Sequence, residues 1–573
     1  MMTIKINRLD TDVLIVGGGS AGMWAARRIK DENSDIDVLI VDKSAADWGG
    51  LMSMSGGDFD AVTPKDNLDD WIQDLVYYYD GLCDQELIEA LFAGSYDRLK
   101  EYEKLGCRYE YDQEGNLKGI PQRNLDHFRL CVAAQKGSGG DDMSRAMVQE
   151  MKRTGVRRMG RIMITKLLKE NDRVVGAIGF HCRDGSCYYI RAKEVLLASG
   201  CNGWKASYGN NTATGDGTLL AYDAGVKLTN FEFARVWNVP KLFAWEGQTV
   251  LLPLGARFVN AKGEDFMKRY SPVFGGNTDP HYTTIAMAKE IERGNGPIYF
   301  DTSGLAPESL PYVTPNAGWQ VLNHEKLKAL GIDFFSGKTE WVPQIMATYG
   351  GIVADPYGRT NVPGVFAAGR ARFIDSGNYI GGFDLSTTAT SGYLAGKAIS
   401  EDLEGKTLSR SLTDEELEPL FEEMLEPLGK PGLGWKEVMR RLQEIVDPYN
   451  VCLIKRESDL ARAMFYCQQA KEELVPRMGA ADPHCLYKLY ETRATALVTE
   501  LYLTASLERK ETRGGHYRVD FPNRNPNLLG WIHLQKGENG PETSFYRMPV
   551  ERYRFPIERY YTDNFDFNGA ASL

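Results

Sequence analysis

The stretch DVLIVGGGSAGMWAARRI, residues Asp12–Ile29, decides the fold of this chain. A short run of β-branched residues and leucine is followed at once by glycines, and good helix formers come next. Gly17, Gly19 and Gly22 fit the pattern G-x-G-x-x-G, and a second apolar run, IDVLIVDKS, ends in Asp42. The order strand, glycine turn, helix, strand and acid predicts a Rossmann-type dinucleotide-binding unit.

The chemistry of this unit follows from its backbone and its acid. The glycines let the N-terminus of the helix approach a pyrophosphate, whose charge the amide groups and the helix dipole stabilise. The carboxylate of Asp42 is placed to accept hydrogen bonds from an adenosine ribose. The motif alone leaves both FAD and NAD open.

The overall composition restricts the class of protein. A chain of 573 residues exceeds one hydrophobic core, so two to four domains are expected. The 67 basic and 78 acidic side chains give a formal charge of −11, which argues against a nucleic-acid partner. No apolar run is long enough for a membrane span, and the N-terminus enters a strand without a signal-like segment. A soluble protein without a membrane span is therefore expected.

The nine cysteines are scattered and include no CxxC pair. This spacing is not typical of an iron–sulfur cluster or a zinc ribbon, so we expect no metal site in the chain. An odd, dispersed set of cysteines fits reduced thiols, and the expected location is the cytoplasm.

Further segments favour FAD over NAD. EVLLASGC (Glu194–Cys201) reads as a buried strand that ends in small residues. TATGDGTLLAYDAG (Thr212–Gly225) places Asp216 at an expected helix start, and VPGVFAAGRA (Val362–Ala371) is another strand-to-glycine unit. GGFDLSTTATSGYLAGKAI follows as a long helix of small residues. These pieces occur in the order expected for one large FAD fold.

With ETRGGHYRVDFPNRN near the C-terminus, these motifs resemble the flavoprotein subunits of the fumarate reductase and succinate dehydrogenase superfamily, over most of residues 10–405. FVNAKGEDF and RGNGPIYFDTSGL are most similar to the alpha subunit of adenylylsulfate reductase. The resemblance implies an α/β fold with a Rossmann-type FAD-binding domain (1–231 and 345–405), an inserted α+β capping domain that holds substrate (232–344) and a helical C-terminal region (406–573). Charged, periodic sequence from 413 to 509 independently favours helices in the last part.

The resemblance also assigns cofactor contacts. Several fumarate reductases attach their flavin to a histidine, but no histidine lies between Lys43 and Val62, so non-covalent FAD is expected. Arg370 departs from the family, because relatives often have glutamate there. The helix that begins near Leu385 would place its dipole against the flavin. The implied cofactor-binding residues are Gly17, Gly18, Gly19, Ser20, Ala21, Gly22, Asp42, Lys43, Gly49, Gly50, Gly56, Gly57, Ile164, Ser199, Gly200, Asp216, Gly369, Arg370, Leu385 and Ser386.

The substrate-binding positions depart from the family more strongly. MATYGGI carries Met346 where relatives carry a histidine, and YIGGFDL carries Tyr379 where they carry a substrate-binding arginine. Trp237 lies near a third such position, and Ile285 falls near their proton-relay arginine. We therefore predict that the chain is not a fumarate reductase. Adenylylsulfate-reductase-like activity stays as an alternative, although its nucleotide-binding arginines have no clear counterpart.

What remains is an aromatic and polar pocket. Tyr349, Tyr379 and Asp384 are candidates to move a proton, and Arg370 is a candidate to hold an anion or an oxyanion. Each also has a structural interpretation, as a wall residue, an ion-pair partner or a packing residue. The candidate catalytic residues are Tyr379, Tyr349, Asp384, Arg370 and His281, and the candidate pocket residues are Met346, Trp237, Arg235 and Arg372.

These observations predict an FAD-dependent oxidoreductase that transfers a hydride between flavin and a small organic substrate. Because the chain has no cluster motif, electrons are expected to pass to or from a separate, ferredoxin-like iron–sulfur subunit. The alternatives are an oxygen-using flavin oxidase and a non-catalytic flavin-binding subunit. The sequence leaves the substrate and the reaction direction open. It also leaves the oligomeric state open, and an oligomer is one of the states that fit.

Overall fold

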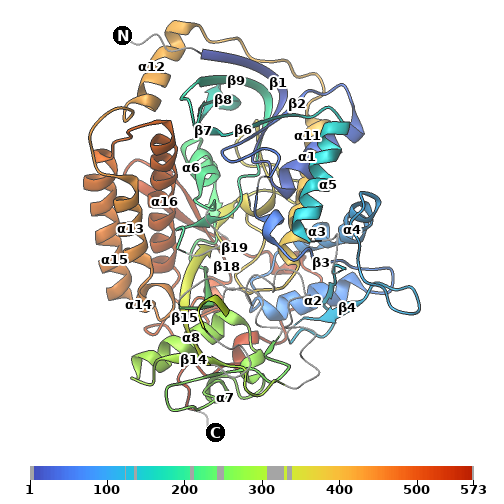
Figure 1. The fold of residues 1–573 in the computed structure, drawn as a ribbon, viewed down its shortest axis with the longest axis vertical. Helices are drawn as coiled ribbons and strands as arrows, with labels where there is room; N and C mark the ends of the chain where they lie inside the picture. The colour runs from blue at the N-terminus through green and yellow to red at the C-terminus, as the bar shows by residue number, and fades with distance from the viewer. Residues whose placement is uncertain are drawn as a thin grey trace.

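The computed structural model describes residues 6–48, 50–122, 124–134, 139–206, 212–241, 251–305, 328–331 and 338–570. Its main sheet has the strand order β6-β2-β1-β9-β8-β7, with β17 paired to β9 (Figure 1). The bounds of these strands are β1 Ile6–Val16, β2 Val38–Asp42, β6 Arg157–Gly160, β7 Ile162–Glu170, β8 Arg173–His181, β9 Cys187–Leu197 and β17 Val365–Ala367.

The central strands of this sheet run parallel. β1 is parallel to β2 and to β9, while β6 and β17 extend the parallel part on its two sides. Val13, Leu14 and Ile15 are fully buried, as expected for a parallel strand that is covered on both faces. The carboxyl ends of β1, β2, β9 and β17 therefore meet at one edge, which is where open α/β sheets bind ligands.

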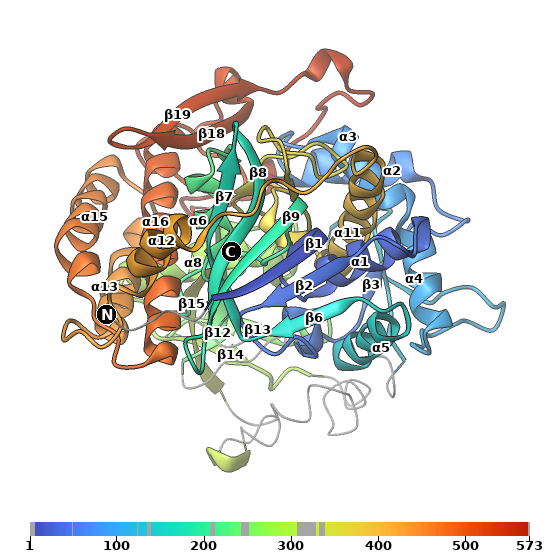
Figure 2. The same ribbon diagram turned by 90° about the horizontal axis from the view of Figure 1, so that it is seen from above.

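One face of the sheet is covered by α1 (Ser20–Glu32), α5 (Gly140–Arg153) and α11 (Phe383–Asp402), which lie close together in Figure 1 and Figure 2. The backbones of α1 and α11 come into contact. A Cβ on Gly392 would lie 2.3 Å from the carbonyl oxygen of Ala21, and one on Gly396 would lie 2.5 Å from that of Ala25. The small-residue sequence of α11 is thus required by its packing on α1.

A second sheet, β10-β15-β14-β13 with β12 paired to β15, forms the capping part. Helix α8 (Pro280–Glu292) packs against β12 and β15. The domain boundary predicted at residue 345 falls inside β15, which continues to Thr348. The strands are β10 Asn202–Gly203, β12 Ala234–Pro240, β13 Arg257–Val259, β14 Ile298–Asp301 and β15 Lys338–Thr348, and the short helix α7 is Met267–Tyr270.

The remaining elements flank these two sheets. A small sheet of β3 (Phe59–Asp60), β5 (Arg129–Cys131) and β4 (Gly119–Pro121) lies near α2, α3 and α4 (Figure 1). These helices are α2 Leu68–Tyr78, α3 Gln85–Ala93 and α4 Ser95–Lys104, and α6 is Asp216–Asp223. Among the described residues, no helix is long and apolar enough to cross a membrane.

The C-terminal region begins with helices, as its periodicity predicted. They are α12 Asp414–Leu425, α13 Trp435–Val446, α14 Tyr449–Cys452, α15 Glu457–Gln469 and α16 Pro483–Glu508. After α16 the chain forms β18 (Gly530–Gly537) and β19 (Gly540–Arg547). β18 pairs with β11 (Leu228–Thr229), which also pairs with β16 (Gly351–Ile352), so the end of the chain returns to the FAD-domain segments.

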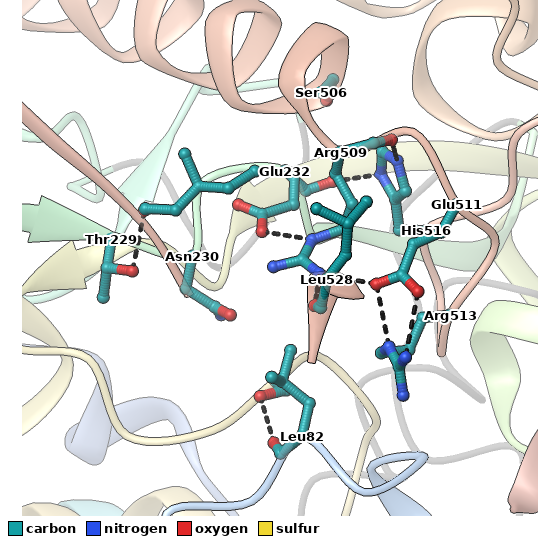
Figure 3. Close-up of polar contacts among 12 residues, drawn as sticks. Leu82, Thr229, Asn230, Glu232, Ser506, Arg509, Glu511, Arg513, His516 and Leu528 are labelled. Atoms are coloured by element: carbon teal, nitrogen blue, oxygen red, sulfur yellow. Dashed lines mark hydrogen bonds and ion pairs between the residues drawn. The ribbon is translucent and has the colours of Figure 1, made fainter. Parts of the chain in front are cut away.

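A buried network of charges joins the segment after α16 to the start of β12 (Figure 3). Arg509 donates through Nε to Glu232 at 2.7 Å and through a terminal nitrogen to Glu511 at 2.7 Å. Arg513 binds the same Glu511 carboxylate at 2.9 and 3.0 Å, and His516 lies 3.1 Å from the carbonyl oxygen of Arg509. Separating the partners of such a buried ion pair would leave an uncompensated buried charge, which is strongly unfavourable. The network therefore holds Glu232 in place.

Candidate active site

Two positions of the glycine turn after β1, Gly17 and Gly22, fit only glycine. Gly17 has a φ of +117°, and a Cβ there would lie 2.3 Å from the carbonyl oxygen of Ala198. A Cβ on Gly22 would lie 2.1 Å from the carbonyl oxygen of Gly17. Helix α1 then begins with Gly19 as its N-cap and without a side-chain cap, so its first amide groups are available to an anion.

Asp42 is held at the end of β2 by the turn itself. The amide of Gly18 donates to one carboxylate oxygen of Asp42 at 2.7 Å. The other oxygen accepts hydrogen bonds of 2.6 Å from both the amide and the hydroxyl of Ser44. The acid is therefore fixed beside the glycine turn, as expected for a residue that contacts a ribose.

Lys43 belongs to a buried ion cluster that sequence reasoning recognised only in part. Its ammonium group donates to Thr214 at 2.8 Å and contacts both Asp216, the first residue of α6, and Glu491 of α16. Burial lowers the pKa of Lys43, but the two carboxylates outweigh it and raise that pKa. Burial raises the pKa of Glu491, whereas the positive charges of Lys43, Lys205 and a third lysine lower it. The charges outweigh burial, and the pKa of Glu491 is lowered to about 2. Glu491 lies within a long helix and has no neighbouring motif.

The other predicted cofactor residues lie in turns near the same edge, with two exceptions. Ser199 and Gly200 follow β9, Gly369 and Arg370 follow β17, and Leu385 and Ser386 are in the first turn of α11. A Cβ on Gly50 would lie 2.8 Å from the Cα of Gly19, while Gly56 and Gly57 precede β3. The exceptions are Ile164, whose side chain is in the apolar core of β7, and Gly49, which lies outside the described residues.

The residues present fit a dinucleotide with a polar ring system at one end. Two helices, α1 and α11, begin at this edge with glycine N-caps that carry no side-chain hydrogen bond. The hydroxyl of Ser386 in the first turn of α11 is fully buried and has no hydrogen-bond partner within the protein. A group bound at this helix end would supply the partner that this hydroxyl lacks.

A pocket opens beside these turns, and Tyr349 points its hydroxyl toward a buried relay of hydrogen bonds. The pocket is lined by Cys201, Arg235, Ala347, Thr348, Tyr349, Gly350, Arg370 and Arg372. The hydroxyl of Tyr349 lies 3.3 Å from Nε2 of His281, and Nδ1 of His281 lies 2.7 Å from the carboxylate of Asp279. All three side chains are buried. Two predicted candidates, Tyr349 and His281, are thus in direct contact, and an acid that sequence analysis missed, Asp279, binds the other ring nitrogen of His281.

Asp279 is ionised because of its partners. Burial raises the pKa of Asp279, but the charge and hydrogen bond of His281 and the hydroxyl of Tyr78 outweigh it and hold that pKa below its usual value. Tyr78 donates to the second carboxylate oxygen at 2.6 Å, and the amide of Tyr379 donates to the same oxygen at 2.8 Å. A carboxylate on Nδ1 keeps the proton there, so Nε2 is the nitrogen that accepts the Tyr349 hydroxyl.

Two arginines of the pocket, Arg370 and Arg235, and two aspartates beside it form a chain of three ion pairs. Arg370 is bound by Asp375 and by Asp384, the latter 2.5 Å from Nε. Arg235 approaches the other oxygen of Asp384 at 3.4 Å. Burial raises the pKa of Asp384, but Arg370 and Arg235 outweigh it and lower it, so Asp384 is an ion-pair partner rather than a general base.

A nearby apolar cluster contains two predicted pocket residues, Trp237 and Met346, and one predicted catalytic residue, Tyr379. Trp237 and Met346 are buried in one cluster with Val239 and Ala347, and Tyr379 packs against it. The rings of Trp237 and Tyr379 meet edge to face, with centroids 4.4 Å apart.

Two family models match the chain: an FAD binding domain over residues 12–383 and the C-terminal part of fumarate reductase flavoproteins over residues 439–561. The first covers more than half of the chain. This chain belongs to the FAD-binding flavoprotein family of fumarate reductase and succinate dehydrogenase. It is therefore an FAD-dependent oxidoreductase of that family, and the expected FAD is confirmed as its cofactor.

Similar proteins agree with the family. One of the subunits of the fumarate reductase (CoM/CoB) of Methanothermobacter marburgensis is 28% identical and aligns with 90% of this chain and 95% of its own. FrdA of the E. coli quinol fumarate reductase has the same fold, with a TM-score of 0.85 and 19% identity. The match covers 96% of this chain and 99% of that one. The structure of adenylylsulfate reductase from Archaeoglobus fulgidus matches with a TM-score of 0.79 and 20% identity, and the match covers 97% of this chain and 98% of that one.

These similarities confirm the predicted fold of the flavoprotein. They do not support the prediction that excluded fumarate reduction, since relatives with that name match nearly the whole chain. That prediction now rests only on the side chains of the pocket.

Within this flavoprotein, the pattern of predicted and missed residues has a physical cause. Arg372 lines the pocket, but its guanidinium donates to the carbonyl oxygens of residues 354, 355 and 373 and so supports the backbone. Burial lowers the pKa of Arg372 to about 10. Asp279 was missed because D-P-H reads as an N-cap followed by proline at the start of α8, a role that Asp279 also has. The Asp-x-His spacing was the one local signal of the relay.

Proposed function

We propose that this flavoprotein oxidises or reduces a small organic substrate in the Tyr349 pocket, with Tyr349 as the group that gives or takes the proton. The observation that carries the proposal is the buried relay in which Tyr349, His281 and Asp279 are joined by contacts of 3.3 and 2.7 Å. Bound FAD supplies the two-electron redox chemistry.

Tyr349 enters the reaction with its phenol protonated. Burial raises the pKa of its phenol well above the usual value, and the cations Arg235 and Arg370 only partly oppose this. A phenol of this kind donates its proton to a substrate atom that gains electron density. Nε2 of His281 takes up a proton from solvent, Asp279 stabilises the imidazolium that this uptake forms, and the imidazolium returns the proton to the tyrosinate. In the opposite direction the same groups accept a proton from the substrate.

Fumarate reduction is not the reaction that this pocket supports best. Met346, Tyr379 and Trp237 pack together as an apolar wall, and Ile285 is fully buried in the capping region. Among these four side chains none is a cation that binds a carboxylate or relays a proton. If fumarate rapidly re-oxidises the chemically reduced, anaerobic holoenzyme at millimolar concentration, this part of the proposal is wrong.

We also propose that electrons are exchanged with a separate ferredoxin-like iron–sulfur subunit. The chain has no cysteine spacing for a cluster, and relatives in this family are named as subunits. Reduced enzyme should react slowly with oxygen and rapidly with an oxidised ferredoxin. Rapid formation of hydrogen peroxide in air would instead favour the oxidase alternative.

The test of the main proposal compares Tyr349→Phe with Tyr379→Phe. The substrate is first identified by anaerobic bleaching of the flavin band with a panel of alcohols, ketones, amines, carboxylates and sulfur compounds. Tyr349→Phe should then retain its flavin but reduce it at least tenfold more slowly, which is about 1.4 kcal/mol in the barrier. An unchanged rate in Tyr349→Phe, with a large loss in Tyr379→Phe, would transfer the proton role to Tyr379.

A further inference from the structure

We propose that the C-terminal helix α16 takes part in binding FAD: its Glu491 is a positioning residue that holds two cofactor loops in place through Lys43. One loop is the turn after β2, which carries Asp42 and Lys43, and the other leads into α6 at Asp216. Both carry residues that are expected to contact FAD. This role concerns how the cofactor is held, so it depends neither on the substrate nor on the proton role of Tyr349.

The ammonium group of Lys43 is fully engaged within the protein. It donates to the hydroxyl of Thr214 at 2.8 Å, to the carboxylate of Asp216, and to one carboxylate oxygen of Glu491 at 2.7 Å. An ammonium group has three N–H donors, and these three acceptors use all of them. Lys43 therefore serves as a joint between its own turn, the start of α6 and α16, and not as a direct donor to the cofactor.

The turn after β2 connects this joint to the ribose end of the site. The carboxylate of Asp42 accepts from the amide of Gly18 at 2.7 Å and from the amide and hydroxyl of Ser44 at 2.6 Å. Lys43 stands between Asp42 and Ser44 in the chain, so a displacement of Lys43 disturbs the hydrogen bonds that orient this carboxylate. The acid expected to bind the ribose is thus held by the same joint.

The start of α6 is fixed at the same edge of the sheet, and α16 packs against it (Figure 1). A Cβ on Gly217 would lie 1.9 Å from the hydroxyl oxygen of Ser199, so α6 begins in close contact with the loop after β9. A Cβ on Gly215 would lie 2.4 Å from the side chain of Val498 in α16. Glu491 adds an ionic contact to this packing.

Glu491 can position Lys43 because it is itself held from its other side. Its side chain is fully buried, and its second carboxylate oxygen lies 2.8 Å from Lys205 and 3.0 Å from Lys488. A buried carboxylate is strongly unfavourable unless it is paired, and these lysines supply the pairing. Without the charge of Glu491, Lys43 would be repelled by the two other lysines and would be drawn away from α16.

The test measures release of FAD from the holoenzyme and needs no turnover. The holoenzyme is diluted at a temperature well below unfolding, and the rise in fluorescence of the released FAD gives the dissociation rate. Glu491→Gln should release FAD at least about tenfold faster than the wild type. Glu500→Gln is the matched control, because Glu500 is a buried acid of the same helix that pairs instead with Lys471. This control should stay within about threefold of the wild-type rate.

A double variant separates a positioning role from a general loss of stability. Lys43→Met removes the same joint from the other side, should also accelerate FAD release at least about tenfold, and keeps the test valid if Glu491→Gln does not fold. Because Glu491 acts through Lys43, the double variant should release FAD no more than about twofold faster than the faster single variant. Wild-type release rates in both single variants, an equal acceleration in Glu500→Gln, or additive effects in the double variant would overturn the proposal.

Discussion

The substitution Asp279→Asn tests the relay most directly, because Asp279 accepts four hydrogen bonds. One oxygen accepts from the amide and Nδ1 of His281 at 2.9 and 2.7 Å. The other accepts from the Tyr78 hydroxyl at 2.6 Å and the Tyr379 amide at 2.8 Å. A carboxamide keeps the shape of the side chain but replaces one of these oxygens with an NH₂ group, which cannot accept.

The better orientation of the new side chain can be deduced from its neighbours. With its oxygen toward His281, only the amide of Tyr379 loses its acceptor, since the Tyr78 hydroxyl can instead donate to the carbonyl oxygen of Tyr379, 2.9 Å away. One orphaned buried amide lowers the free energy of unfolding by about 1–3 kcal/mol. The imidazolium also loses its counter-charge, worth about 4 kcal/mol for two unit charges 4 Å apart at an effective dielectric of 20. Because the imidazolium forms only transiently, a rate loss of about hundredfold or more is expected.

The assay is anaerobic stopped-flow reduction of the flavin, with flavin content and thermal unfolding measured on the same protein. Tyr78→Phe is the matched control, because it removes one donor to Asp279 and leaves the contact with His281 intact. We expect this control to stay within about threefold of the wild-type rate. If Asp279→Asn retains its flavin and reacts within about threefold of wild type, the relay does not move the proton.

Three other perturbations test different parts of the molecule. Gly22→Ala should lose most of its FAD, because the new Cβ would lie 2.1 Å from the carbonyl oxygen of Gly17; flavin content after purification measures this, and full occupancy would contradict it. Burial lowers the pKa of Lys455 to about 7. An unfolded lysine still binds its proton between pH 7 and 10.5, so this group makes the fold more stable as pH rises through that window, by up to about 5 kcal/mol. Lys455→Met should remove that slope from urea unfolding curves, and parallel pH profiles for both proteins would show the assignment to be wrong. Glu491→Gln should destabilise the holoenzyme by about 3 kcal/mol at neutral pH. The low pKa of Glu491 in the folded state stabilises the fold at any pH above the usual pKa of a glutamate, and this stability is lost as the pH falls toward 2. Equal melting temperatures of the variant and the wild type at pH 7 would refute this.

The sequence predicts those parts of the fold whose signals are local. The glycine turn from Gly17 to Gly22, the small-residue helix α11 and the helices after residue 413 each carry their own pattern, so they could be recognised without a partner. β18 and β19 lie in a region predicted to be helical. They form a local hairpin, but the pairing that joins this hairpin to the rest of its sheet is that of β18 with β11, which is about 300 residues away along the chain. No local pattern records such a pairing.

The same distinction applies to the site. Tyr349 and His281 were chosen as candidates separately, for their chemistry, and their contact spans 68 positions. Lys43 and Glu491 are 448 positions apart. Proximity of this kind is produced by the tertiary fold, so the sequence suggests which groups are reactive but not which of them meet.

The close packing of α11 on α1 also determines how the protein distinguishes its cofactor from a shorter one. Gly392 and Gly396 bring the two helix backbones into contact, so the N-termini of α1 and α11 cannot move independently. One terminus lies at the glycine turn and the other at the turn of Leu385 and Ser386, and their separation is fixed before any ligand arrives. A flavin mononucleotide has no adenosine end and cannot use both termini at this spacing. We therefore expect the two rigid helices to favour a full dinucleotide, in addition to the contact expected between Asp42 and the adenosine ribose.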